Sequence, residues 1–187
     1  DPLWSRGLGD VYKRQLAHLA NMHYVRQGKP RGLGHAVGVG KAFIGNEPFA
    51  VMLGDDLIDA KTPVLPAMCE VQEKFGGSVL CLMEVDPSQI HMYGCAAVVE
   101  TDLPGVVRVT GLVEKPAPGT APSNYAVIGR YVLAPEVFEI LENQPAGRGG
   151  EIQLTDALAT LIDVPAAQGG GVHAVIFSGK RYDTGDK

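Results

Sequence analysis

Continuous apolar runs alternate along the chain with segments whose apolar positions recur every three or four residues. The clearest runs are residues 49–53 (FAVML) and 78–84 (SVLCLME), and between them residues 63–75 show a helical pattern with proline in its first turn. Strands that are buried on both faces lose the alternation of polar and apolar residues. This strand–helix–strand order predicts a right-handed crossover between parallel strands, with helices on both faces of a sheet.

The remaining elements are weaker. A helix at 35–43 contains Gly38 and Gly40, which lower its helical propensity, and residues 16–22 and 23–26 are predicted as a helix end and a short strand. We therefore expect an α/β fold of three layers, α/β/α, around a mixed, mainly parallel Rossmann-like sheet. The other predicted strands are 93–99, 106–114, 125–133 and 173–177, and the other predicted helices are 135–142 and 151–162.

Composition narrows the class of protein. The 187 residues are 45% hydrophobic and 20% charged, which fits one globular domain. The net charge of −5 is spread along the chain, so we expect no nucleic-acid polymer and no membrane as a partner. Three cysteines lie far apart among apolar neighbours, which indicates reduced thiols. No apolar run approaches the roughly 20 residues of a membrane span, and no signal peptide is apparent, so we expect a cytoplasmic protein.

The two ends differ from the rest. Residues 1–15 show neither helical nor strand periodicity, and we interpret them as a non-native head that does not belong to the domain. Residues 16–187 form the domain itself, which we expect to be incomplete at both ends.

The stretch GDDLI raises the main chemical question. Asp55 and Asp56 follow directly after the predicted strand 49–53. Open α/β sheets bind ligands beyond the carboxyl ends of their strands, so a cation site is one reading. A solvated polar turn that closes the strand is the other, and the stretch alone leaves both open.

Three further stretches combine polar residues with loops or strand ends. Gln27 has an amide that suits the edge of a nucleobase, and Gly32 would let backbone approach a ligand closely; an ordinary glycine-rich connector is the alternative. Glu114 can accept from sugar hydroxyls and Lys115 can neutralise a phosphate, although the same pair also suits a solvated strand end. Asp183 follows a possible strand and precedes Thr-Gly, as in a simple turn.

The segment GGEIQLTDAL at 149–158 gives a weaker signal. Glu151 and Asp156 could simply complement a helix dipole in its first turn, and Thr155 could be a packed residue. No histidine has metal-binding spacing, and no Ser or Cys nucleophile motif is present, so we assign no covalent catalysis.

Taken in order, five stretches are more specific than any one of them: VRQGKPRGLGHAV, PFAVMLGDDLI, GLVEKPAPGTAPSNYAVIGRYVL, GGEIQLTDAL and GKRYDTGDK. From about Leu16 to the last residue, the chain resembles the sugar nucleotidyltransferases, and among them the bacterial UTP–glucose-1-phosphate uridylyltransferases. The resemblance implies the nucleotide-diphospho-sugar transferase fold and makes 16–187 a partial nucleotidyltransferase domain.

The resemblance also implies a reaction. UTP and glucose 1-phosphate would give UDP-glucose and pyrophosphate, by in-line attack of the sugar phosphate oxygen on the α-phosphorus of UTP. Such transfers depend on positioning and charge neutralisation, with Mg²⁺ held by one or two carboxylates. The catalytic residues would be Asp55, Lys115 and Asp183, with Asp55 and Asp183 as the metal ligands and Asp56 in a supporting place. The substrate-binding residues would be Gln27, Gly32, Gly94, Glu114, Lys115, Gly129 and Tyr131.

One family feature is not matched. The glycine-rich loop and lysine that grip the UTP triphosphate have no counterpart in these residues. Removing one donor to a developing charge costs about 10²–10³ in rate, so we expect this chain alone to be inactive or weak. The alternatives are a thymidylyl- or uridylyltransferase for another sugar 1-phosphate, or a non-catalytic sugar-nucleotide-binding module. By resemblance, the intact protein is expected to be a homo-oligomer.

Overall fold

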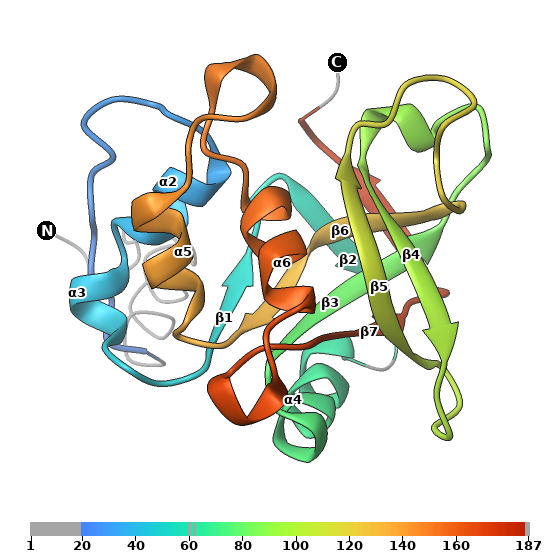
Figure 1. The fold of residues 1–187 in the computed structure, drawn as a ribbon, viewed down its shortest axis with the longest axis horizontal. Coiled ribbons are helices and arrows are strands. Elements are labelled where there is room, and N and C mark those ends of the chain that lie inside the picture. Colours follow the sequence, from blue (N-terminus) through green and yellow to red (C-terminus); the bar gives the residue numbers. More distant parts are fainter. Residues whose placement is uncertain (1–19, 60, 62, 186–187) are drawn as a thin grey trace, which may run out of the picture.

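A mixed sheet and a small two-stranded ribbon organise the protein (Figure 1). The structure is a computed structural model, and it describes residues 20–185 apart from residues 60 and 62. The head at 1–15 and the first residues of the helix end predicted at 16–22 lie outside this range. Among the described residues, six strands form the main sheet, in the order β1-β6-β3-β7-β5-β4, and β2 pairs with β8.

The predicted elements are largely present. The strands are β1 (Phe49–Met52), β2 (Asp56–Asp59), β3 (Ser78–Glu84), β4 (Gly94–Glu100), β5 (Val106–Glu114), β6 (Tyr125–Leu133), β7 (Val172–Ile176) and β8 (Lys180–Asp183). The α-helices are α2 (Leu33–Gly38), α3 (Lys41–Ile44), α4 (Val64–Phe75), α5 (Val137–Asn143) and α6 (Leu154–Ile162). Short 3₁₀ turns are η2 (Ile90–Met92), η3 (Arg148–Gly150) and η4 (Ala166–Gln168).

The α/β class and the mixed sheet are confirmed, but the pairing differs from the prediction. β3 and β7 are parallel, whereas β6 lies between β1 and β3 and is antiparallel to both. β5 is antiparallel to β7 and to β4. β1 and β3 point the same way on either side of β6, as the predicted crossover requires, but among the described strands only β3 and β7 pair in parallel. Local periodicity shows that a strand is buried but does not identify its neighbour.

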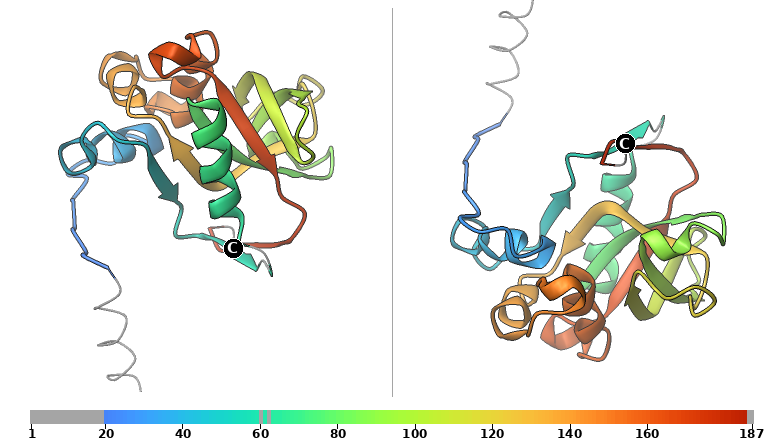
Figure 2. Two further views of the ribbon diagram at one scale, coloured as in Figure 1. Left: turned by 90° about the horizontal axis from the view of Figure 1, so that it is seen from below. Right: turned by 90° about the horizontal axis from the view of Figure 1, so that it is seen from above.

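Helices cover both faces of the sheet, as expected (Figure 2). On one face, α4 packs Met68 and Val71 against Val79 and Cys81. On the other face, α2, α5 and α6 enclose the larger core, in which α6 buries residues at helical spacing. Apolar surface that is buried on folding stabilises the protein by roughly 25 cal/mol per Å². These two layers are therefore the main source of stability.

The sheet curls at the end that carries the candidate site. Cys95 of β4 pairs with Ala126 of β6, in addition to the pairing of β4 with β5. The strands β6, β3, β7, β5 and β4 therefore follow one another back to β6. This curl brings the start of β4 and the end of β5 to the same rim as the N-terminal half of β6.

Three local predictions change. The helix expected at 35–43 is divided into α2 and α3, with Gly38 and Gly40 flanking the break. Residues 23–26 are exposed and form no strand, because no neighbouring strand pairs with them among the described residues. β2 was not expected at all, since four residues with an aspartate at each end give little apolar signal.

Candidate active site

Asp55 and Asp183 lie together although 128 positions separate them in the sequence. The ribbon brings them close, because Asp56 of β2 pairs directly with Asp183 of β8. Thr184 donates two hydrogen bonds to the carbonyl of Asp55, from its backbone N–H (2.8 Å) and its hydroxyl (2.9 Å). A Cβ added at Gly185 would lie 3.0 Å from Asp55 Oδ2 and 3.3 Å from Asp183 Oδ1. Both carboxylates therefore border the same point.

Asp56 has a different environment from its neighbour. It is only 4% exposed, whereas Asp55 is exposed. Its Oδ2 accepts a 2.7 Å hydrogen bond from the backbone N–H of Gly129, and its Oδ1 lies 2.8 Å from Nε of Arg181. Both oxygens of Asp56 are thus used inside the protein, while no described residue donates to the Asp55 carboxylate. The Asp55 carboxylate is therefore open to solvent, whereas that of Asp56 is occupied inside the protein.

Arg181 joins the acidic residues to the neighbouring rim of the sheet. Its side chain is 12% exposed, and Nη2 lies 2.9 Å from Asp183 Oδ2. Nη1 donates to the hydroxyl of Tyr93 at 3.2 Å, and the guanidinium stacks over the Tyr93 ring at 5.1 Å. Burial lowers the pKa of Arg181, but hydrogen bonds to Asp56 and Tyr93 outweigh it and hold this pKa above its ordinary value. The side chain is a permanent cation with three anchored donors.

Glu114 and Gly94 face each other at the ends of β5 and β4. The hydroxyl of Thr155, at the start of α6, donates a 2.6 Å hydrogen bond to Glu114 Oε2. A Cβ at Gly94 would lie 3.3 Å from Glu114 Oε2 and from Thr155 Oγ1, so any larger residue would crowd this pair. Thr155, which was considered a packing residue, thus holds the Glu114 carboxylate in one orientation.

Lys115 has an unusual backbone conformation. Its φ is +45°, in the left-handed region that non-glycine residues seldom occupy. Its backbone N–H donates to the carbonyl of Tyr93 at 3.0 Å, and the guanidinium of Arg148 donates to its carbonyl. Strained conformations of this kind persist only where surrounding contacts enforce them, and they are common at functional sites. The ammonium is exposed and meets no acid among the described residues.

The loop that holds Gln27 folds onto the start of α6. Gly32 has φ +100°, and a Cβ there would lie 2.7 Å from the carbonyl oxygen of Ile152, so the chain requires glycine. Nε2 of Gln27 lies 3.3 Å from the Gly32 carbonyl and 2.7 Å from Nδ1 of His35. Because a carbonyl only accepts, the amide nitrogen must face inward, and no described residue bonds Oε1 of Gln27.

Gly129 and Tyr131 lie beneath the site on β6. A Cβ at Gly129 would lie 2.8 Å from Leu53 Cβ and 2.9 Å from Asp56 Cβ, so glycine is what allows the acidic turn to approach this strand. Tyr131 is 6% exposed and packs in the core. Burial raises the pKa of the Tyr131 phenol, and the charges of Glu114 and Asp56 raise it further.

Arg181, Tyr93 and the contact of Thr155 with Glu114 were not predicted from the sequence. A signal for Arg181 was present, because residues two apart on a strand point to the same face and Arg181 precedes Asp183 by two. Tyr93 and Thr155 gave no such signal. Each contacts a residue that is distant in the sequence, and only the tertiary structure brings the two together.

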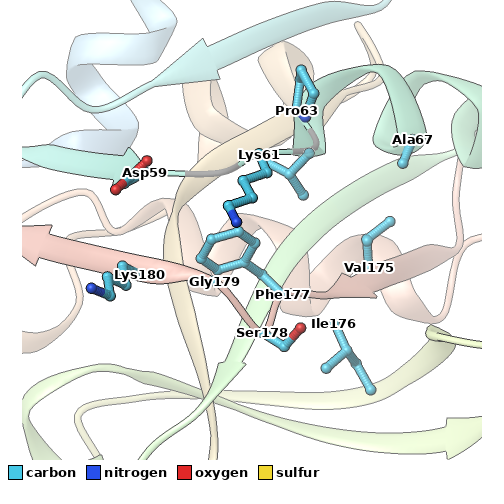
Figure 3. A pocket seen from close by; sticks show the side chains of 11 residues that line it. Asp59, Lys61, Pro63, Ala67, Val175, Ile176, Phe177, Ser178, Gly179 and Lys180 are labelled. Atoms are coloured by element: carbon cyan, nitrogen blue, oxygen red, sulfur yellow. The ribbon is translucent and has the colours of Figure 1, made fainter.

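A separate cavity lies beyond the opposite end of the ribbon (Figure 3). Its volume is about 640 Å³, and Asp59 and Lys180, which pair across β2 and β8, are among its lining residues. Phe177 and Val175 supply apolar lining, and Lys61 adds a second ammonium. None of the predicted site residues lines it.

The donor set at the acidic residues is small. Among residues 20–59, 61 and 63–185, no group of three or more His, Cys, Asp or Glu side chains is placed to hold a metal ion. A cation at Asp55 and Asp183 would therefore have two protein carboxylates and would need further oxygens from a ligand or water.

In the same described residues, no helix is long and apolar enough to cross a membrane.

The family model described as nucleotidyl transferase matches residues 6–186, almost the whole chain. The chain belongs to the nucleotidyl transferase family. The match includes residues 6–15, most of the stretch that we interpreted as a non-native head. The sequence resemblance to this family is confirmed.

Several similar nucleotidyl transferases are UTP–glucose-1-phosphate uridylyltransferases or UDP-glucose pyrophosphorylases. The UTP–glucose-1-phosphate uridylyltransferases of Staphylococcus haemolyticus and Bacillus subtilis are 48% and 45% identical over 90% and 93% of this chain. A solved structure of a UDP-glucose pyrophosphorylase complexed with UDP-glucose is 43% identical, with a TM-score of 0.83 over 92% of this chain. The chain spans 57% and 58% of those two relatives and 64% of that structure, less than two thirds of each.

Proposed function

We propose that this nucleotidyl transferase makes UDP-glucose and pyrophosphate from UTP and glucose 1-phosphate. The observation that carries the proposal is the convergence of Asp55 and Asp183 on one point, which Arg181 and Tyr93 connect to the end of β5 at Glu114 and Lys115. The names of the similar proteins, whose alignments cover most of this chain, support the same reaction. In the transfer, the bond from the sugar phosphate oxygen to the α-phosphorus forms while the bond to the β-phosphate breaks, and pyrophosphate leaves.

A divalent cation fits the acidic pair. Asp183 Oδ2 meets Arg181 and its Oδ1 accepts the Gly185 N–H at 3.1 Å, which leaves lone pairs free on both oxygens. Asp55 is exposed, and the described residues bond its backbone but not its carboxylate. Two carboxylates completed by phosphate and water oxygens are the arrangement that suits Mg²⁺ in particular. When bound, Mg²⁺ would neutralise charge on the phosphate oxygens.

The protein residues supply binding and orientation on either side of the phosphates. Lys115 would place its exposed ammonium against the sugar phosphate, in a position set by the bonds to its own backbone. Glu114, oriented by Thr155, would accept hydrogen bonds from glucose hydroxyls. Gly94 would leave room for the sugar beside this carboxylate.

Gln27 would recognise the base. With Nε2 turned inward to Gly32 and His35, the amide offers its carbonyl oxygen as an acceptor. Uracil carries an N–H donor at N3, whereas cytosine has an acceptor there, so this orientation favours UTP over CTP. Thymine has the same N3 donor, and dTTP is therefore the nucleotide alternative to exclude by assay.

The test is pyrophosphate release by the full-length protein with Mg²⁺. UTP with glucose 1-phosphate should be the best pair against dTTP, CTP, galactose 1-phosphate and N-acetylglucosamine 1-phosphate. A preference for dTTP or for another sugar phosphate would support the alternative transferase. Binding of UDP-glucose without turnover of any pair would support the non-catalytic module.

Two broader expectations accompany this function. The three cysteines are free, which fits a reducing cytoplasm, where we propose the reaction takes place. The homo-oligomer inferred from the resemblance stays a prediction that sedimentation can test.

A further inference from the structure

We propose that Arg181 is a positioning residue that fixes Asp183 for cation binding and couples this carboxylate to the sugar-binding rim. The inference rests on the proposed function, since it assigns a further residue to the same site. Arg181 is exposed by only 12%, yet each terminal nitrogen reaches a different functional element. A single buried fork thus connects the acidic residues to Tyr93.

The contacts of Arg181 divide cleanly by role. Nε at 2.8 Å from Asp56 Oδ1 anchors the guanidinium in the interior. With this anchor in place, Nη2 holds Asp183 Oδ2 at 2.9 Å and restricts the rotation of that carboxylate. Arginine is suited to this task because its donors lie in one rigid plane, whereas a lysine ammonium has no fixed fork.

The net charge of Arg181 and its partner decides whether this residue strengthens or weakens cation binding at Asp183. A cation beside a proposed metal site would repel a divalent ion if it were unpaired. Asp56 forms an ion pair with Arg181 and neutralises its charge, so the pair as a whole contributes little net charge at Asp183. The remaining contribution of Arg181 is orientation of a metal ligand. Loss of groups that orient metal ligands typically weakens metal binding about 10–100-fold.

The third contact extends the effect to the sugar side. Nη1 bonds the Tyr93 hydroxyl, and the cation stacks over the ring. Tyr93 is followed by Gly94 and accepts the backbone hydrogen bond of Lys115. Arg181 therefore ties the position of Asp183 to the residues proposed to hold the sugar phosphate.

The experiment compares metal affinity with stability in the full-length protein. Mn²⁺ alone is the probe, followed by electron paramagnetic resonance, and urea unfolding reports stability. The variants are Arg181→Met, Asp56→Asn with Arg181→Met, Arg181→Lys, Asp183→Asn, and Lys180→Met as the matched control. Lys180 precedes Arg181 on β8, is exposed and does not contact Asp183.

Arg181→Met should lower the urea midpoint, because it leaves Asp56 buried without a counter-ion. The double variant keeps the pair neutral, so its midpoint should return towards the parent while Mn²⁺ binding stays about 10-fold weaker or more. Lys180→Met should change neither property. Recovery of parent Mn²⁺ affinity in the double variant would overturn the inference, because Arg181 would then be only a counter-ion for Asp56.

Two variants keep the test decisive. Arg181→Lys retains the charge without the fork, and it should also bind Mn²⁺ more weakly; parent affinity would contradict the proposal even if the double variant fails to fold. Asp183→Asn reports on the metal site itself. If it binds Mn²⁺ as well as the parent, then the metal assignment fails, and the positioning role fails with it for that separate reason.

Discussion

The backbone N–H of Gly129 donates a 2.7 Å hydrogen bond to the carboxylate of Asp56, which lies 73 positions earlier in the chain. This bond fixes the turn after β1 onto the middle of β6. Because Asp56 is held inward, the adjacent Asp55 is turned outward, where it borders the same point as Asp183. A structural contact thus determines which of two consecutive aspartates is available to a ligand.

Gly129→Ala should destabilise the fold by about 1–3 kcal/mol, since its Cβ would lie within 2.9 Å of Leu53 and Asp56 atoms. Gly111→Ala, in β5, is the matched control, because its nearest contact would be 3.5 Å. Urea unfolding of both variants measures the difference. Equal stability of the two would show that the turn can move away from β6.

Asp55→Asn and Asp56→Asn should fail in different ways. Asp55→Asn should keep parent stability and lose about 10²-fold or more in pyrophosphate release, because a proposed metal ligand is lost. Asp56→Asn should lower stability by about 1.5–3 kcal/mol, because Arg181 loses its buried partner charge and keeps only the carboxylate of Asp183. Asp59→Asn, at the other end of β2, is the control. Normal turnover by Asp55→Asn would remove that residue from the proposed site.

Thr155→Val should raise KM for glucose 1-phosphate by about 10-fold, because Glu114 loses the donor that orients it. KM for UTP should not change. Thr160→Val is a matched control, since that exposed hydroxyl on the same helix bonds only the carbonyl of Asp156. Steady-state kinetics with each substrate varied separately would distinguish this result from general damage, which would raise both KM values or lower stability.

Gln27→Met should raise KM for UTP by about 10-fold and narrow the preference for UTP over CTP, because the acceptor proposed for uracil N3–H is removed. Lys29→Met, exposed in the same loop, should retain that preference. Competition between the two nucleotides in one assay gives the ratio directly. An unchanged ratio in Gln27→Met would place base recognition elsewhere.

His173 should make stability depend on pH. Burial lowers the pKa of His173, the nearby charge of Arg108 lowers it further, and its Nδ1 is buried without a partner among the described residues. As pH falls below about 6.5, the unfolded chain takes up the proton first, so the free energy of unfolding should decrease until the folded pKa is reached. His173→Gln should reduce this slope in urea unfolding between pH 7.5 and 5, whereas the exposed His91→Gln should leave it unchanged.

Local sequence patterns predicted most of the secondary structure. β3, β5 and β6 have the predicted bounds, and α4 and α6 lie where their apolar spacing and flanking residues indicated. Short polar strands could not be predicted in this way. β2 has too few apolar residues to be read as a strand, and its partner β8 begins 121 positions after β2 ends.

The fold class and the family could be predicted from the amino-acid sequence, because buried strands, amphipathic helices and five ordered stretches are local properties of the chain. How the candidate site residues lie relative to one another became known from the tertiary structure. It placed β6 between β1 and β3, turned Asp56 inward and Asp55 outward, and gave Glu114 its donor in Thr155. These relations depend on contacts between segments far apart in the chain, which local periodicity cannot encode.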